Sequence, residues 1–192
     1  MNWLRLALIG SVLALVVHLV VLLISGQNPI QTPISQLSRH QWGWLQSLGL
    51  IGFGGAHIAL AVALRKMDHG RLWPYGRALL VASGVTLFYI AYYFVASGDA
   101  ALSGPDANDP LWIVASLTGT AMGALQPGLA RLARGLGLFS AMCLGVWLWL
   151  IVLLIFVNDS WLGAYERIVG AVYLAWITGV TLGLIKARNA RD

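Results

Sequence analysis

The sequence predicts an all-α integral membrane protein, a bundle of six transmembrane helices in one domain with both termini in the cytoplasm. Three observations indicate this fold class. First, 59% of the 192 residues are hydrophobic and only 10% are charged, whereas soluble domains carry roughly 25% charged residues. Second, six apolar stretches have a length near the roughly 20 residues with which a helix crosses a bilayer. Third, Lys and Arg residues are concentrated in the segments that would share one membrane face.

The first two spans flank a polar turn. Residues 4–25 form an apolar run that is too long for the hydrophobic region of a signal peptide, and no small-residue cleavage site follows it, so we expect a retained helix. Thr32 as N-cap and Pro33 at the first helical position predict a new helix start. We expect this start to form an interfacial turn that leads directly into the second span, residues 42–64.

Four further spans follow with short connections. The third is predicted at residues 77–97, and the fourth, residues 111–129, is the most polar and carries Pro127 near its end, where a local kink is expected. The fifth and sixth are predicted at residues 136–157 and 164–185. No connection is long enough to hold another domain, so all 192 residues should form one membrane domain.

The orientation follows from the basic residues, because Lys and Arg in short loops mark the cytoplasmic side. With the N-terminus inside, ten of the twelve basic residues are cytoplasmic, and only Arg39 and Arg167 lie outside. We therefore predict an N-in and C-in topology in the bacterial inner (cytoplasmic) membrane.

Several function classes are disfavoured. The pI near 9.8 does not indicate nucleic-acid binding, because the basic residues stand at the ends of apolar runs and form no stripe. The sequence contains no His-Glu-x-x-His, no Gly-x-Ser-x-Gly, no phosphate-binding glycine loop and no acidic pair within a span. We expect no metal and no cofactor.

Haem is disfavoured by the depths of the two intramembrane histidines, His18 and His57. At a rise of 1.5 Å per residue they should differ in depth by about 10 Å. Two axial ligands of one iron must instead lie about 4 Å apart at nearly one level. For each histidine, a neutral, hydrogen-bonded packing role is therefore preferred over a proton-handling role.

Other residues within the spans are candidates because polar groups are costly at that depth and aromatic rings there pack or line a pocket. Thr118 and Gln126 lie in the fourth span, where hydrogen bonds between helices would explain them. Trp147, Trp149 and Trp176 fall near mid-depth of the last two spans; packing is favoured, and lining a hydrophobic pocket is the alternative. Small residues in the second and fourth spans, Gly52, Gly55, Ala56, Gly119 and Gly123 among them, predict close helix seams.

The most informative cluster is predicted at the outer face. Arg39 and Arg167 stand near Ser35, Ser38 and Glu166 at the starts of outer helices. This group could be a structural cap of ion pairs, or a site that holds an anionic headgroup or a polar ligand above a hydrophobic cavity. Of the two, the structural cap is preferred.

Two short motifs carry a resemblance to a known family. The stretch Pro-Ile-Ser-x-Leu at residues 33–37 follows the first span, and Gly-x-x-Glu-Arg at residues 163–167 opens the last one. In this the chain resembles the bacterial six-span membrane proteins catalogued as domain of unknown function 998. The resemblance covers essentially the whole chain and implies an architecture and candidate positions, without implying a reaction.

The favoured function is non-enzymatic: binding or moving a lipid or another hydrophobic small molecule through the polar outer cap. The first alternative is a membrane enzyme acting on a lipid or isoprenoid, with His18 or Glu166 as acid or base and Ser35 or Ser38 nearby. The second is an accessory subunit whose glycine seams bind a partner helix. An apolar cavity opening to lipid would support binding, whereas convergence of His18, Ser38 and Glu166 would support catalysis.

Overall fold

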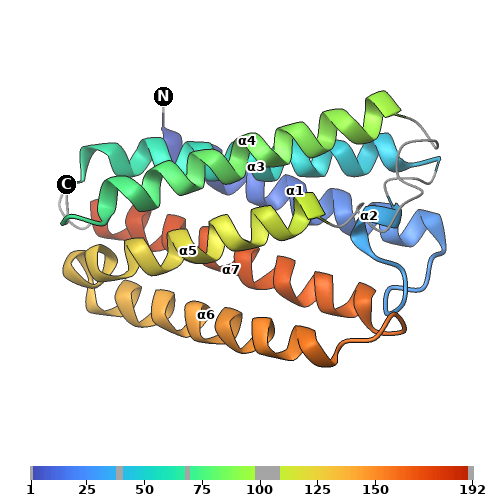
Figure 1. Ribbon diagram of the computed structural model, residues 1–192. Helices are drawn as coiled ribbons and strands as arrows, with labels where there is room; N and C mark the ends of the chain where they lie inside the picture. Colours follow the sequence, from blue (N-terminus) through green and yellow to red (C-terminus); the bar gives the residue numbers. More distant parts are fainter. Residues whose placement is uncertain (1, 38–40, 68–69, 98–108, 190–192) are drawn as a thin grey trace.

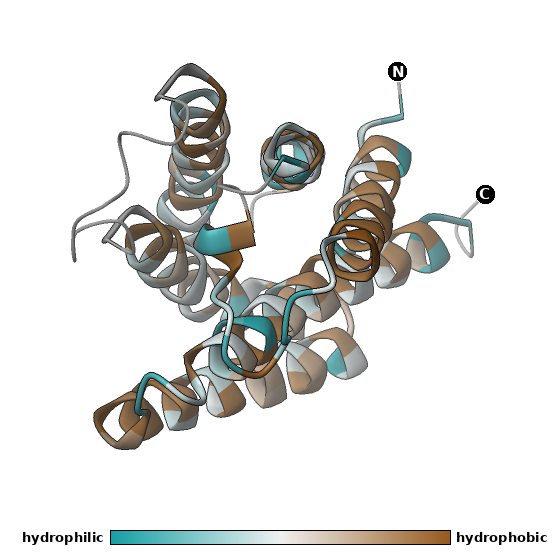
Figure 2. Ribbon diagram, turned by 90° about the vertical axis from the view of Figure 1, so that its right-hand side faces the viewer, coloured by the Kyte–Doolittle hydropathy of each residue, from teal (hydrophilic) through white to brown (hydrophobic). Residues whose placement is uncertain are grey.

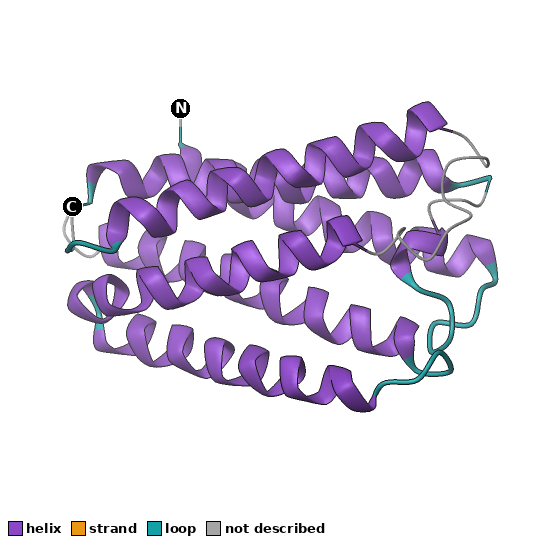
Figure 3. Ribbon diagram, viewed as in Figure 1, coloured by secondary structure: helices purple, strands orange, loops and turns teal. Residues whose placement is uncertain are grey.

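The computed structural model describes residues 2–37, 41–67, 70–97 and 109–189, and every regular element in these ranges is helical (Figure 1, Figure 3). The all-helical prediction is thus confirmed for them. The elements are the long helices α1 (Trp3–Ser25), α3 (Gly43–Ala63), α4 (Trp73–Ser97), α5 (Asp109–Leu132), α6 (Arg134–Leu153) and α7 (Leu162–Asn189), the short helix α2 (Ile34–Leu37), and the 3₁₀ turns η1 (Leu64–Lys66) and η4 (Leu154–Phe156).

Five of the described helices are long and apolar enough to cross a membrane: α1, α3 with η1, α4, α6 with η4, and α7. Helix α5 is not among them, because Thr118, Thr120 and Gln126 interrupt its apolar sequence. The chain therefore has the helices of a multi-pass membrane bundle. That α5 also crosses the membrane stays a prediction.

The outer surface of the bundle is apolar in the way that contact with lipid requires. Leu23 on α1 is 80% exposed, and Ile155 and Phe156 in η4, which follows α6, are 81% and 77% exposed. In water such surfaces would drive association, whereas lipid tails are as apolar as these side chains.

The long helices form a ring. Each packs against the next in chain order, and α7 packs against both α6 and α1 (Figure 2). The start of α1 and the end of α7 lie at the same end of the bundle, while α2 lies at the opposite end, which we call the α2 end (Figure 1). The N-in and C-in orientation itself stays a prediction.

Glycines allow two of these helix pairs to approach closely. A Cβ atom on Gly10 of α1 would collide with the carbonyl of Gly52 in α3, and one on Gly54 of α3 would lie 2.8 Å from the carbonyl of Gly84 in α4. The predicted seam therefore exists at Gly52. A Cβ on Gly55 would meet nothing within 4 Å, so this glycine belongs to no seam.

Candidate functional site

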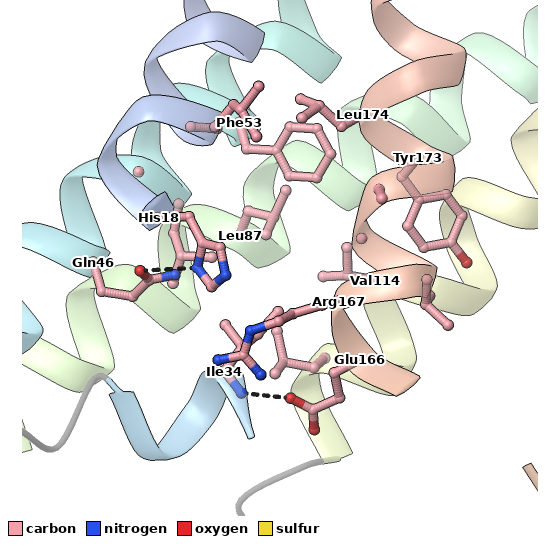
Figure 4. Close-up of a pocket in the computed structure, with 18 of the residues that line it drawn as sticks. His18, Ile34, Gln46, Phe53, Leu87, Val114, Glu166, Arg167, Tyr173 and Leu174 are labelled. Atoms are coloured by element: carbon pink, nitrogen blue, oxygen red, sulfur yellow. Dashed lines mark hydrogen bonds between the residues drawn. The ribbon is translucent and has the colours of Figure 1, made fainter. Parts of the chain in front are cut away.

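A half-open cavity of about 340 Å³ lies among α1, α3, α4, α5 and α7 (Figure 4). Its wall is mainly apolar, with Leu50, Leu87 and Leu174 on three different helices. Leu15 and Leu19 of α1 also line it and are 44% and 48% exposed, so the cavity reaches the outer surface beside α1. A volume of this order is typical of pockets for small molecules, which span roughly 300–1,000 Å³.

Four polar side chains gather at one part of this cavity: His18, Gln46, Glu166 and Arg167 (Figure 4). They come from α1, α3 and α7, so the closure of the ring by α7 brings them together. His18 Nδ1 lies 3.4 Å from Gln46 Oε1, a long hydrogen bond. The other ring nitrogen, His18 Nε2, is buried and has no hydrogen-bond partner.

Arg167 fastens the connection between α1 and α2 to the start of α7. We call residues 29–34, which are the end of this connection and the first residue of α2, the strap. Nη1 of Arg167 lies 2.8 Å from three carbonyl oxygens, those of Pro29 and Thr32 in the strap and that of Gly163 within α7, and its two N–H groups are shared among them. One nitrogen of the guanidinium is therefore committed to the backbone.

Two neighbours of Arg167 complete the attachment. Oε2 of Glu166 accepts a hydrogen bond from the backbone N–H of Ile34 at 2.7 Å (Figure 4). Gly163 lies directly against Thr32, where a Cβ atom would stand 2.8 Å from the carbonyl carbon and 2.9 Å from the amide nitrogen. Real Cβ atoms essentially never approach backbone so closely, so only glycine fits at this position.

The two motifs that carry the family resemblance are thus one structural joint. Residues 33–37 and 163–167 meet at the α2 end, and Leu37 is fully buried in a cluster with Val17 and Val21 of α1. Within the described residues, the hydrogen-bond partners of Glu166 and Arg167 are backbone groups, whereas the cap that we preferred consists of ion pairs. That cap stays a prediction, because Arg39 lies outside the described residues. Helix α2 also begins at Ile34, one residue after the expected start, and the carbonyl of Pro33 accepts its first hydrogen bonds.

The other two nitrogens of the Arg167 guanidinium make no hydrogen bond to the strap. These atoms, Nε and Nη2, are buried, and neither has a hydrogen-bond partner. Arg167 lines the cavity, where Figure 4 shows its guanidinium next to the His18 ring. Three of the four buried, unpaired side-chain polar atoms in the described residues therefore belong to this one site.

A second polar site lies among the apolar helices, at His57. Its Nδ1 lies 2.8 Å from the carbonyl oxygen of Phe53, and its Nε2 lies 3.2 Å from Thr118 Oγ1, which in turn lies 2.7 Å from Ser83 Oγ. A neutral ring with its hydrogen on Nδ1 satisfies this series of hydrogen bonds. Nδ1 then donates to the Phe53 carbonyl, Ser83 donates to Thr118, and Thr118 donates to Nε2. Both ring nitrogens are engaged, which supports the packing role that we preferred. In the described ranges, no three His, Cys, Asp or Glu residues group closely enough to hold a metal ion.

The three tryptophan candidates lie outside the cavity, so the pocket role considered for them has no support in this structure. Trp176 is fully buried, and its Nε1 donates to Ser140 Oγ at 2.9 Å. Trp147 packs on Gly119, and Trp149 is 61% exposed. They are packing and surface residues here.

The remaining candidates divide into two groups. Ser38, Arg39 and the side chain of Ser35 lie outside the described part of the chain, so their predicted roles stay predictions. Gln126 is half-buried on α5 and does not line the cavity. Sequence reasoning missed Gln46, although a polar side chain inside a predicted span is the same signal that pointed to His18.

Comparison with known proteins gives a family. A family model described as "Protein of unknown function (DUF998)" matches residues 8–183, which include both motifs and every residue that lines the cavity. No curated protein and no solved structure matches the chain significantly.

Proposed function

The chain belongs to the DUF998 family, and we propose that this member is a six-span protein of the bacterial inner membrane that binds or moves a lipid or another hydrophobic small molecule. The ligand occupies the cavity that reaches the surface beside Leu15 and Leu19. The observation that carries the proposal is the combination of an apolar wall with buried, unpaired donors at one part of it. A molecule with an apolar body and a polar end would satisfy both.

The apolar wall and the polar part of the cavity would contribute differently to ligand binding. In a bilayer, apolar side chains gain little by exchanging lipid tails for another apolar surface. The apolar wall therefore selects by shape, whereas the polar part at His18 and Arg167 gives the preference for one ligand over bulk lipid. Unpaired buried polar groups are costly, and this cost is removed when a ligand supplies their partners.

Gly170 offers a direct test, because it lines the cavity and a Cβ atom there would meet nothing within 4 Å. Gly170→Leu should place a side chain in the cavity and obstruct the ligand without disturbing the backbone. Gly145→Leu on α6 is the matched control, since Gly145 has the same free space and does not line the cavity. Native mass spectrometry after mild extraction should find the same bound molecule on the wild type and Gly145→Leu, but not on Gly170→Leu. Equal occupancy of all three proteins would refute the proposal, as would a wild type that carries nothing.

The topology is tested separately by labelling single cysteines in a Cys143→Ala background. Lys66 ends the turn that follows α3, and Asn158 follows the turn after α6, so the two residues lie at opposite ends of the bundle. Both are exposed. With the N-terminus inside, a membrane-impermeant maleimide should label Asn158→Cys in intact spheroplasts and Lys66→Cys only after lysis. The reverse pattern would overturn the N-in orientation.

A further inference from the structure

The buried edge of Arg167 restricts the chemistry of the ligand's polar end. We infer that this cavity takes a fatty-acid-like monocarboxylate, whose carboxylate is held by the Nε and Nη2 edge of Arg167; the inference rests on the proposed function. Nη1 is already used by three backbone carbonyls, and the two remaining nitrogens are buried without partners. The protein thus holds two charged donors out of water and supplies no acceptor for them.

The geometry of the edge favours a carboxylate. The N–H groups on Nε and Nη2 are parallel and lie in one plane, and a carboxylate presents two coplanar oxygens that pair with both. A hydroxyl or an ester carbonyl would pair with only one of them. Because Nη1 is fixed to Pro29 and Thr32 of the strap, the edge keeps its direction when the cavity is empty, which lowers the entropic cost of binding.

His18 supplies a third donor at the same place. Its Nε2 is buried without a partner, and its ring lies beside the guanidinium (Figure 4). Exchange of the Gln46 amide oxygen and nitrogen lets the amide donate to Nδ1, which leaves the hydrogen of a neutral imidazole on Nε2. That N–H is then available to donate to a ligand in the same cavity that Arg167 lines.

The charge of the site limits the ligand to a single negative charge. Glu166, the residue before Arg167 in α7, lines the same cavity, and its Oε2 accepts a hydrogen bond from the Ile34 amide. One guanidinium balances one carboxylate, whereas a doubly charged phosphate would leave one negative charge unbalanced between the apolar helices, close to the carboxyl group of Glu166. The site therefore favours a monocarboxylate over a phosphate monoester.

Four ligands with one tail and different ends test this on the wild-type protein, without any variant that could fail to fold. Palmitate, methyl palmitate, hexadecanol and hexadecyl phosphate are titrated into nanodiscs that contain the protein, with Gly170→Leu nanodiscs as the blank. Palmitate should bind at least about tenfold more tightly than the ester and the alcohol, because charge-assisted bidentate bonds are lost in both. Hexadecyl phosphate should also bind more weakly than palmitate.

The outcomes separate the two proposals. Equal affinity for palmitate and methyl palmitate, both abolished in Gly170→Leu, would overturn the carboxylate inference and leave cavity binding intact. If hexadecyl phosphate binds most tightly, the inferred preference for a monocarboxylate is wrong. Absence of specific binding by all four would overturn the carboxylate inference, whereas the native mass spectrometry of the wild type and Gly170→Leu decides whether the cavity binds a ligand at all.

Two variants locate the effect. Arg167→Lys keeps the positive charge and loses the parallel edge, so the preference for palmitate over methyl palmitate should fall to less than about threefold. His18→Leu leaves the strap bonds of Arg167 untouched and should weaken the binding of palmitate severalfold, by a larger factor than it weakens the binding of methyl palmitate. An undiminished preference for palmitate in His18→Leu and in a folded Arg167→Lys protein would contradict the assignment of these residues.

Discussion

The two histidine sites of this bundle, at His18 and at His57, contrast in how completely their hydrogen bonds are satisfied. At His57, one assignment of hydrogens gives every donor an acceptor among Phe53, Thr118 and Ser83. At His18, the ring nitrogen Nε2 is buried and unpaired, and so are Nε and Nη2 of the adjacent Arg167. A polar group within apolar helices is therefore structural when its neighbours complete it, and points to a ligand when they do not.

The helix arrangement explains the difference. His57 lies between α3, α4 and α5, which pack on one another in chain order and leave it fully buried. His18 faces α7, the helix that closes the ring, and the cavity lies between them. The strap holds the start of α7 in place at this point through Glu166 and Arg167.

The largest effect on stability is expected for Arg167→Ala, which removes the two N–H donors of Nη1 from the three carbonyls that share them. Hydrogen bonds from charged groups contribute about 1.5–3 kcal/mol each, so we expect a loss of about 3 kcal/mol or more. In detergent this should lower the melting temperature by about 6–12 °C. Arg188→Ala, at an exposed position in the last turn of α7, is the control and should melt like the wild type. An unchanged melting temperature for Arg167→Ala would show that the strap does not stabilise the bundle.

Gly163→Ala should break the same joint by steric overlap alone. Its Cβ atom would collide with the backbone of Thr32, and such overpacking costs about 1–3 kcal/mol. Gly135→Ala on α6 is matched to it, because a Cβ atom there meets nothing within 4 Å. Thermal melts of both proteins in one detergent check this; equal stability would mean that the contact between α7 and the strap is not tight.

Thr118→Val should show that the two histidine sites have different roles, because it should lower stability without affecting ligand binding. The hydroxyl of Thr118 joins His57 to Ser83, and all three are fully buried, so its removal leaves polar groups unpaired at a cost of about 1–3 kcal/mol. The melting temperature should fall, while occupancy by the co-purified ligand stays at the wild-type level. Loss of the ligand from a folded Thr118→Val protein would contradict the claim that the His57 site is structural and independent of the ligand site.

Gln46→Leu should have the smallest effect on stability. The distance of 3.4 Å between His18 Nδ1 and Gln46 Oε1 indicates a weak bond, worth less than about 1 kcal/mol. Ligand binding should weaken more than stability does, because Gln46 orients the His18 ring. Chemical denaturation and ligand titration of the same preparation measure both; a larger loss of stability than of binding free energy would reverse this interpretation.

Much of the fold follows from local sequence. Each of the six predicted spans overlaps one long helix, because apolar length and breaks with charge or glycine are properties of the chain itself. The differences lie at the ends. Helix α4 begins at Trp73, before the predicted residue 77, since Pro74 is tolerated in a first turn. Helix α5 runs through Pro127 to Leu132, past the predicted end at residue 129.

The site was less predictable, because it depends on how helices are rotated against one another. Glu166 and Arg167 stood out through their position in the sequence, but their backbone partners in the strap belong to a segment more than 130 residues away. The partner of His57 was uncertain for the same reason, since Ser83 and Thr118 lie on two other helices. No sequence pattern distinguishes the satisfied histidine from the unsatisfied one.

Photocrosslinking with a diazirine-labelled palmitate tests most directly that the unsatisfied site is a ligand site. In nanodiscs, adducts that excess palmitate competes away should map to the cavity residues Leu15, Leu50 and Leu174, and should disappear in Gly170→Leu while remaining in Gly145→Leu. Adducts confined to the exposed face of α6 around Trp149 and Ile155, with none in the cavity, would contradict the account.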